Sequence, residues 1–133
     1  MFHRVLPQGE ECYDPELVTS TDAFAGFLDW LSENYRVLPI DELVAYRGKS
    51  ANPRRPLCAI TFDDGWVDNY LHAFPLLYDR QLPATIFLPL RFIGTTRRFW
   101  QEQLWLAMKN LDPRLQRQLV LVLAPAPESP PPT

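Results

Sequence analysis

Apolar residues recur at helical spacing between residues 20 and 34. The positions i, i+3, i+4 and i+7 are occupied by Phe24, Phe27, Leu28 and Leu31. This spacing places them on one face of an α-helix. Ser20 or Thr21 can cap the first turn, because a hydroxyl oxygen accepts a bond from an unpaired backbone N–H there. The pattern predicts a helix over residues 20–34, and a shorter one is expected over residues 41–46.

Two apolar runs farther along have the pattern of strands buried on both faces. They are residues 57–62, which are partly β-branched, and residues 84–88. Between them, apolar residues return at helical spacing over residues 66–77, where Pro75 predicts a kink or a restart of the helix. A strand, a helix and a strand at this separation predict a parallel βαβ unit, and the whole chain is expected to have an α/β fold.

The C-terminal part divides into a helical stretch and a proline-rich tail. Residues 99–123 carry an apolar stripe that we expect to face a core, and Pro113 interrupts it. The members of the stripe are Trp100, Leu104, Trp105 and Met108, and we expect the other aromatic residues to lie in the core as well. Residues 124–133 hold five prolines and no large apolar residue. We therefore expect a folded part over residues 1–123 and a disordered tail over residues 124–133.

Composition and charge narrow the classes of function. The 133 residues are 47% hydrophobic and 22% charged, which is typical of one soluble globular domain. The net charge of -3 provides no basic stripe, so nucleic-acid binding is not expected. Two cysteines, Cys12 and Cys58, cannot build a metal knuckle or a disulfide framework. Since neither a signal-peptide core nor the ~18 apolar residues of a membrane span occurs, the cytoplasm is the default expectation.

The most informative residues are two adjacent acids, Asp63 and Asp64, which close the run at 57–62 and precede Gly65. In parallel α/β folds the active site forms at the carboxyl ends of the strands, so both carboxylates are expected to face a pocket. Two neighbouring carboxylates repel each other unless a divalent cation shares them. One acid can then bind the metal while the other accepts a proton from the metal-bound water. The alternative is that the pair only caps the following helix.

The residues around the acid pair extend the pattern. They are AITFDDGW at 59–66, DNY at 68–70, Ala73, PLL at 75–77 and ATIFL at 84–88. This set closely resembles the polysaccharide deacetylase (NodB-homology) family, carbohydrate esterase family 4. His3-Arg4-Val5 resembles the family's first-strand Tyr-His-x-Val element, with Phe2 in place of the tyrosine. Phe92-Ile93-Gly94 and Phe99-Trp100 are similar to a branch that acts on cell-wall and envelope polysaccharides, so the resemblance covers residues 2–108.

The resemblance implies a distorted (β/α) barrel that hydrolyses N-acetyl, or O-acetyl, groups of a polysaccharide with a bound metal, usually zinc. By position in the motif, Asp63 corresponds to the catalytic base and Asp64 to a metal ligand. The family also needs a His-[Ser/Thr]-x-x-His segment, whereas this chain has only His3 and His72. We therefore expect a partial (β/α) barrel, truncated after roughly half the barrel. This N-terminal part is expected to bind zinc weakly and to be inactive alone.

Two further residues are candidates for contact with an N-acetylated polysaccharide. His3 is expected to point into the same mouth as Asp63, where it either touches the substrate or holds another site residue. Trp66 can wall a sugar ring, although an aromatic residue at a helix start more often packs. A phosphoryl-transfer receiver does not fit, because that class needs an acid at the end of the next strand and residues 84–88 run into Pro89-Leu90-Arg91 instead. A non-catalytic carbohydrate-binding or interaction module derived from a deacetylase remains an alternative, since the paired histidines are absent.

Overall fold

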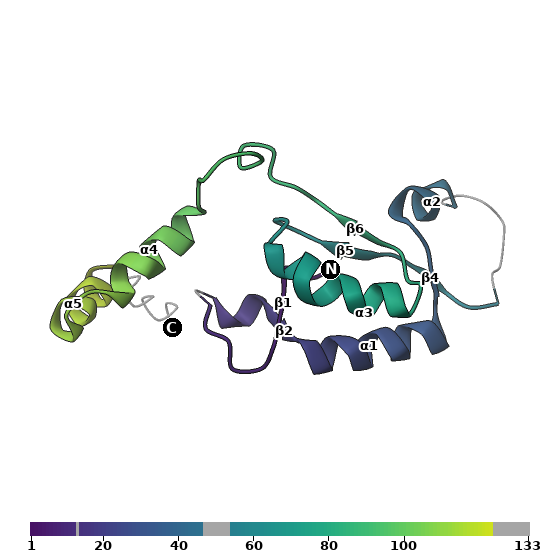
Figure 1. The fold of residues 1–133 in the computed structure, drawn as a ribbon, viewed down its shortest axis with the longest axis horizontal. Coiled ribbons are helices and arrows are strands. Elements are labelled where there is room, and N and C mark those ends of the chain that lie inside the picture. Colours follow the sequence, from purple (N-terminus) through teal and green to yellow (C-terminus); the bar gives the residue numbers. More distant parts are fainter. Residues whose placement is uncertain (13, 47–53, 124–133) are drawn as a thin grey trace, which may run out of the picture. The chain divides into compact units, whose positions relative to one another are not determined.

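The computed structural model describes residues 1–12, 14–46 and 54–123. The chain divides into two compact units, Met1–Thr96 and Arg97–Thr133, of which the first carries the strands and the acid pair (Figure 1). The tail expected at residues 124–133 lies outside the described residues. Within the described ranges, no helix combines the length and the apolar character that a membrane crossing requires.

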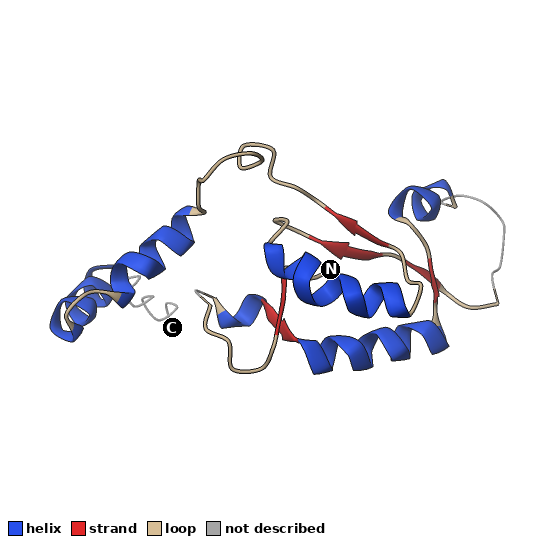
Figure 2. Ribbon diagram, in the orientation of Figure 1, coloured by secondary structure: helices blue, strands red, loops and turns tan. Residues whose placement is uncertain are grey.

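The first unit is mixed α/β, and its strands pair in parallel (Figure 2). Its elements are β1 (Arg4–Leu6), η1 (Pro15–Leu17), β2 (Val18–Ser20), α1 (Thr21–Asn34), β3 (Arg36–Val37), α2 (Ile40–Ala45), β4 (Leu57–Cys58), β5 (Ile60–Phe62), η2 (Asn69–Ala73), α3 (Phe74–Asp79) and β6 (Ala84–Ile86). The pairs are β1 with β2, β3 with β4, and β5 with β6. A single bridge joins Phe2 to Phe62, and the described strands do not close into a barrel.

Helix α1 confirms the first sequence prediction. The side-chain oxygen of Ser20 accepts a hydrogen bond from the Ala23 N–H at 3.2 Å, so Ser20 is the cap. The predicted apolar face is buried at three of its four positions, while the fourth, Phe27, is 40% exposed. Helix α2 confirms the short second helix within one residue at each end.

The prediction of one strand over residues 57–62 is wrong in detail. The structure has two strands, β4 and β5, separated by Ala59. They are separate because β4 pairs with β3 while β5 pairs with β6, so the chain bends between two different neighbours. The predicted parallel βαβ unit is confirmed by the pairing of Ile60 with Ala84 and of Phe62 with Ile86.

Strand β6 is also less buried than predicted. Ile86 is 45% exposed, and Phe87 and Leu88, which follow it, are exposed to a similar degree. The physical reason is that only β5 among the described strands pairs with β6, so no strand on the other side brings side chains to pack beside these residues. A continuous apolar run therefore correctly indicated a strand and overstated its burial.

The helix after the acid pair begins at Val67 and contains the wide turn η2 before α3. In this π-type turn the Phe74 N–H donates to the carbonyl of Asn69, five residues earlier. Pro75 explains the irregularity, because it has no N–H to donate and its ring would clash with the carbonyl of Leu71 in a regular α-helix. The predicted kink at Pro75 thus takes the form of a widened turn just before it.

A phenylalanine cluster forms the part of the core below the acid pair. Ring centroids are 5.0 Å apart for Phe2 and Phe24, 5.8 Å for Phe24 and Phe62, and 5.6 Å for Phe2 and Phe62. Phe24 and Phe62 are fully buried, so α1 and β5 pack through these rings. Because Phe2 precedes His3 and Phe62 precedes Asp63, this packing fixes the backbone on which the candidate site is built.

Helices α1 and α3 lie side by side and share an exposed ion pair (Figure 1). The Arg80 guanidinium donates to both carboxylate oxygens of Asp29, at 2.6 and 3.2 Å. This hydrogen bonding lowers the pKa of Asp29 and raises the pKa of Arg80. Since Asp29 is exposed, the pair is expected to contribute little to the free energy of folding.

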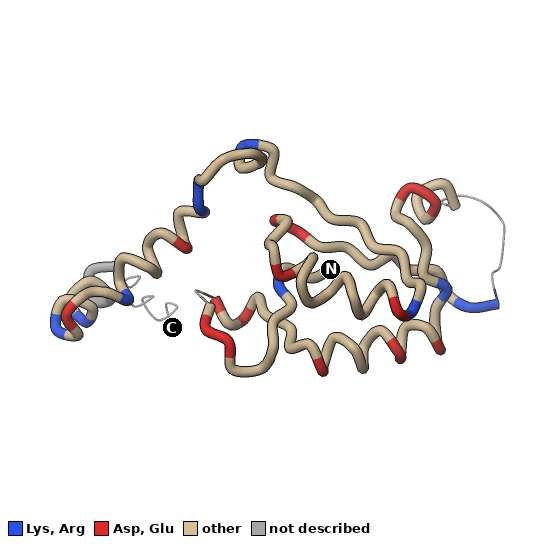
Figure 3. Tube along the Cα trace, in the orientation of Figure 1, with Lys and Arg blue, Asp and Glu red and all other residues tan. Residues whose placement is uncertain are grey.

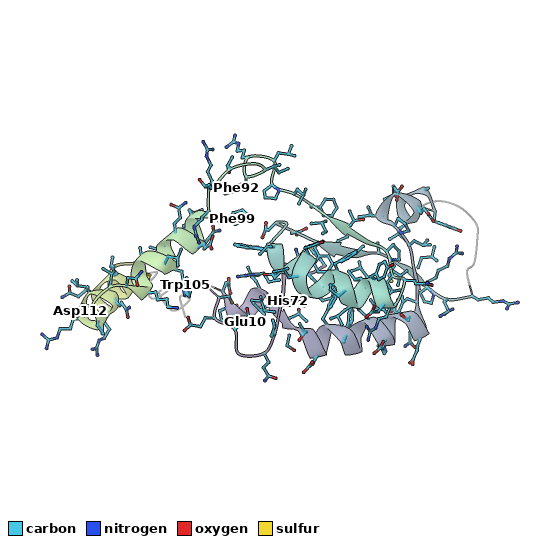
Figure 4. All side chains as sticks on the ribbon, in the orientation of Figure 1. Glu10, His72, Phe92, Phe99, Trp105 and Asp112 are labelled. Carbon is cyan, nitrogen blue, oxygen red and sulfur yellow. The ribbon has the colours of Figure 1, made fainter. Side chains whose placement is uncertain are left out.

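The second unit contains α4 (Trp100–Lys109) and α5 (Pro113–Leu123), with Asp112 at the turn between them (Figure 4). The prediction of a core-facing stripe in α4 is wrong, because no residue of this helix is buried and Trp100 is 69% exposed. Two short helices cannot surround such a ring. Several aromatic residues of the first unit also lie outside the core, namely Trp30, Tyr70, Phe74 and Tyr78.

Candidate active site

The acid pair lies in the turn that directly follows β5. The strand ends at Phe62, so Asp63 and Asp64 stand at its carboxyl end, as the sequence predicted (Figure 3). Asp64 has a φ of 70° and Gly65 a φ of 61°, which are both in the left-handed region. Two such residues in succession reverse the chain and interrupt the side-chain alternation of the strand. Asp tolerates this conformation better than most residues with a side chain.

The helix-cap interpretation of the acid pair is not supported. Neither carboxylate accepts a hydrogen bond from the backbone N–H groups at the start of the helix that begins at Val67. Among the described residues, the carboxylate of Asp63 forms no hydrogen bond or ion pair at all. The backbone N–H of Asp63 is bound to the carbonyl of Phe2 at 3.0 Å. The main chain of Asp63 is therefore fixed while its carboxylate stays available for chemistry.

His3 lies beside Asp64. Its Nδ1 is 3.4 Å from Oδ2 of Asp64, and the two side chains are 27% and 33% exposed. The pair is within ion-pair distance, but Nδ1 has no hydrogen-bond partner among the described residues. We interpret this contact as a close approach of the two side chains that is not a hydrogen bond. The structure therefore brings together His3 and Asp64, where the sequence led us to expect His3 near Asp63.

Trp66 follows the turn and is half-buried. The guanidinium carbon of Arg4 lies 4.5 Å from the centroid of its ring, in a cation–π contact. One face of the indole is thus already covered by a residue of β1. The predicted role of Trp66 as a wall for a sugar ring remains a prediction, and any such contact has to use the rest of the ring.

Three polar residues next to the acid turn were not predicted to take part in the site. Arg4 donates through Nε to Oδ2 of Asp68 at 2.7 Å, and the neighbouring Asn69 is buried with Asp68. A signal for them existed in the sequence, because Arg4 stands in an apolar strand and Asp68-Asn69 stand in an apolar helix. Polar groups in such places need partners when they are buried.

The described residues do not by themselves fit a catalytic zinc ion. Such a site takes three protein ligands and leaves one position open. In the part of the chain that the structure describes, no three His, Cys, Asp or Glu side chains gather in a way that could hold a metal. Asp64 is one suitable donor, and His72 sits half-buried in η2 (Figure 4). The zinc predicted from the sequence therefore requires donors from elsewhere.

Comparison with known proteins identifies the family. Residues 50–114 match the family model described as polysaccharide deacetylase, and this segment includes the acid turn, β5 and β6. This segment belongs to the polysaccharide deacetylase family. The parallel βαβ unit around Asp63 and Asp64 is therefore part of a deacetylase domain.

Individual relatives agree with this assignment. The chain is 34% identical over 82 residues to YxkH of Bacillus subtilis, whose name describes it as a putative polysaccharide deacetylase. The match covers 61% of this chain and 29% of that protein. It is 35% identical over 74 residues to the poly-beta-1,6-N-acetyl-D-glucosamine N-deacetylase of Staphylococcus epidermidis, covering 55% and 25%. The solved structure of IcaB from Ammonifex degensii matches with a TM-score of 0.59 at 30% identity, covering 75% and 40%. The chain thus spans less than a third of the curated relatives that it matches.

In this deacetylase segment the turn at Gly65 packs tightly against Leu88, which lies two residues after the end of β6. A Cβ atom built on Gly65 would collide with Cδ2 of Leu88. Leu88 is half-exposed and its methyl group can move, so the collision alone is cheap. The positive φ of Gly65 is the larger obstacle to a side chain.

Gly65→Ala is expected to destabilise the fold by about 1–2 kcal/mol, because alanine is strained in the left-handed region. Gly26→Ala is the matched control. Gly26 lies in α1 with nothing within 4 Å of an added Cβ. The Gly26→Ala substitution should therefore stabilise the fold by about 0.5–1 kcal/mol. Urea denaturation followed by circular dichroism measures both, and equal effects of the two substitutions would contradict the role given to the turn.

A pocket of about 700 Å³ lies between α3 and β6, and its lining extends to Phe62 and Asn69. Its lining includes Phe74, Tyr78 and Ile86, and it includes neither acid of the pair. The two carboxylates of the acid turn are partly exposed. The pocket therefore begins beside the strand that carries the acid turn, at Phe62, without including the two carboxylates.

Proposed function

We propose that this chain supplies the carboxylate pair of a metal-dependent hydrolase that removes N-acetyl groups from a polysaccharide. The observation that carries the proposal is the Asp63-Asp64 turn at the carboxyl end of β5, with His3 at 3.4 Å from Asp64. The names of the relatives support the substrate class, because the Staphylococcus epidermidis protein is a poly-beta-1,6-N-acetyl-D-glucosamine N-deacetylase.

In this proposal Asp63 is the catalytic base. Its carboxylate is partly exposed and has no partner among the described residues, so it can accept a proton from the attacking water. The water oxygen bonds to the acetyl carbon, and the bond between that carbon and the sugar nitrogen then breaks. The nitrogen leaves with the proton that Asp63 accepted, and the products are acetate and a free amine.

Asp64 and His3 have a different task. Asp64 is proposed as the metal ligand of the segment, with further ligands from outside the described residues. A bound zinc ion would polarise the acetyl oxygen. His3 is proposed to hold the carboxylate of Asp64 in place at the substrate side, since the Nδ1 atom of its ring lies 3.4 Å from Oδ2 of that carboxylate. Trp66 is proposed to contact the sugar with the part of its ring that Arg4 leaves uncovered.

A non-catalytic carbohydrate-binding module is the second candidate. It is favoured by the ligand count, because the sequence has only two histidines and the described residues form no three-donor group. Such a module would keep Trp66 and the acid turn as a surface for a glycan, without releasing acetate.

Acetate release separates the two functions. The comparison needs the 133-residue chain and a completed domain, by which we mean this chain joined to the part of a relative's domain beyond the matched segment. With zinc and acetylated chito-oligosaccharides, we expect the completed domain to release acetate and the chain alone to release none. Glycan binding without acetate release from either protein would favour the non-catalytic module. Release from the chain alone would contradict the ligand count.

A further inference from the structure

We infer that Asp68, acting with Asn69, is a positioning residue that holds His3 against Asp64. The inference rests on the proposed function for its chemical meaning, while its geometry is independent of it. Neither Asp68 nor Asn69 belongs to the acid turn, and both are only 2% exposed. Two adjacent polar side chains at that depth require an explanation by their partners.

The carboxylate of Asp68 binds the two residues that follow His3. Its Oδ2 accepts from Nε of Arg4 at 2.7 Å, and its Oδ1 accepts from the backbone N–H of Val5 at 3.4 Å. The first contact is charge-assisted and nearly buried, since the side chains of Arg4 and Asp68 are 14% and 3% exposed. Asp68 therefore attaches the start of β1 to the helix that follows the acid turn.

Asn69 binds His3 itself. With its amide turned so that the nitrogen meets the neighbouring acceptors, Asn69 donates to the carbonyl of His3 at 3.1 Å and to Oδ1 of Asp68 at 3.2 Å. Three consecutive residues, from His3 to Val5, are thus bound by two consecutive residues of the helix. These bonds form one connected network in which each member has a partner.

A second anchor lies on the other side of His3. The Phe2 N–H donates to the carbonyl of Thr61 at 2.8 Å, and the Asp63 N–H donates to the carbonyl of Phe2 at 3.0 Å. His3 is therefore held between the β5 backbone before it and the Asp68 network after it. The position of its ring beside Asp64 follows from these two attachments of the main chain.

Stability alone does not account for this network. A buried ion pair is weak evidence for stability, because apolar residues of similar volume are often equally stabilising in its place. What apolar residues cannot supply is directional bonding to the carbonyl of His3 and the N–H of Val5. The directional bonds fix the register and the distance between β1 and the helix after the acid turn, and with them the contact of His3 with Asp64.

Nuclear magnetic resonance on the 133-residue chain tests the inference. The measurement is the nuclear Overhauser contact between the His3 ring protons and the β-protons of Asp64, in protein labelled on histidine and aspartate. Since the chain has only two histidines, His72→Gln assigns the ring signals. Asp68→Asn keeps the size of the side chain and presents a donor to Arg4. We expect this variant to lose most of the contact intensity, and Asn69→Ala to do the same.

Asp29→Asn is the matched control, because it changes the exposed pair with Arg80, and Asp29 is not among the residues that bind His3, Arg4 or Val5. It should leave the contact unchanged. A folded Asp68→Asn and a folded Asn69→Ala that both keep the full contact would overturn the inference. Loss of folding in both variants would also overturn it, because the network would then be a stability element. If the contact is lost while acetate release by the completed domain is unchanged, the proposed role of His3 fails and the positioning stands.

Discussion

Asp63→Asn in the completed domain is expected to lower the rate of acetate release by about a hundredfold or more, with zinc content unchanged. Asparagine has almost the same shape as aspartate, but its amide cannot accept the proton of the attacking water. The backbone bond from Asp63 to Phe2 does not involve the side chain, so the turn should keep its conformation. Initial rates of acetate release at several substrate concentrations measure the effect.

The fall in rate should lie in kcat, because a base acts in the transition state and contributes little to ground-state binding. Asp41→Asn is the control. It removes an exposed carboxylate in the first turn of α2, away from the acid turn, and should leave kcat unaltered. An unchanged rate in Asp63→Asn would show that another group takes the proton, and the assignment of the base would have to be abandoned.

Asp64→Asn is expected to weaken zinc binding by the completed domain by at least about a hundredfold. Removing a residue that only supports a metal ligand costs about 10–100-fold in affinity, and removing the ligand itself should cost more. Zinc titration with a competing chelator measures the affinity, and acetate release should fall in parallel. The substitution also removes the charge that faces His3 at 3.4 Å.

Asp63→Asn serves as the reference for this second substitution, since the two variants remove the same charge from neighbouring positions. The proposed roles require opposite patterns, with the metal kept in Asp63→Asn and lost in Asp64→Asn. If Asp63→Asn loses the metal and Asp64→Asn retains it, the roles are reversed. If both variants bind zinc as tightly as the unmodified protein, the acid pair is not the metal site.

The elements that depend on local pattern could be predicted from the sequence. Helix α1 was predictable because its apolar spacing and its Ser20 cap act within one segment. The position of Asp63 and Asp64 was predictable as well, since a strand, two acids and a glycine follow one another in the chain. The parallel pairing of β5 with β6 followed from the length of the connection between them.

The remaining features depend on neighbours that a local pattern does not contain. The break at Ala59 arises because β4 and β5 pair with different strands. The exposure of Ile86 depends on which described elements cover β6, and an apolar run looks the same whether or not it is covered. The bond from Arg4 to Asp68 joins residues 64 positions apart, so the sequence could at most have marked both as polar residues in apolar surroundings.

Among the described strands, β6 pairs at one edge only, and this bears on how the chain behaves in a cell. A strand that presents apolar side chains and unpaired backbone groups is a template on which other chains can add. Molecular chaperones and proteases act on surfaces of this kind, so their action governs how much of the protein accumulates. The yield and the half-life of the chain in a cell should therefore depend on how well the edge of β6 is covered, as well as on the free energy of folding.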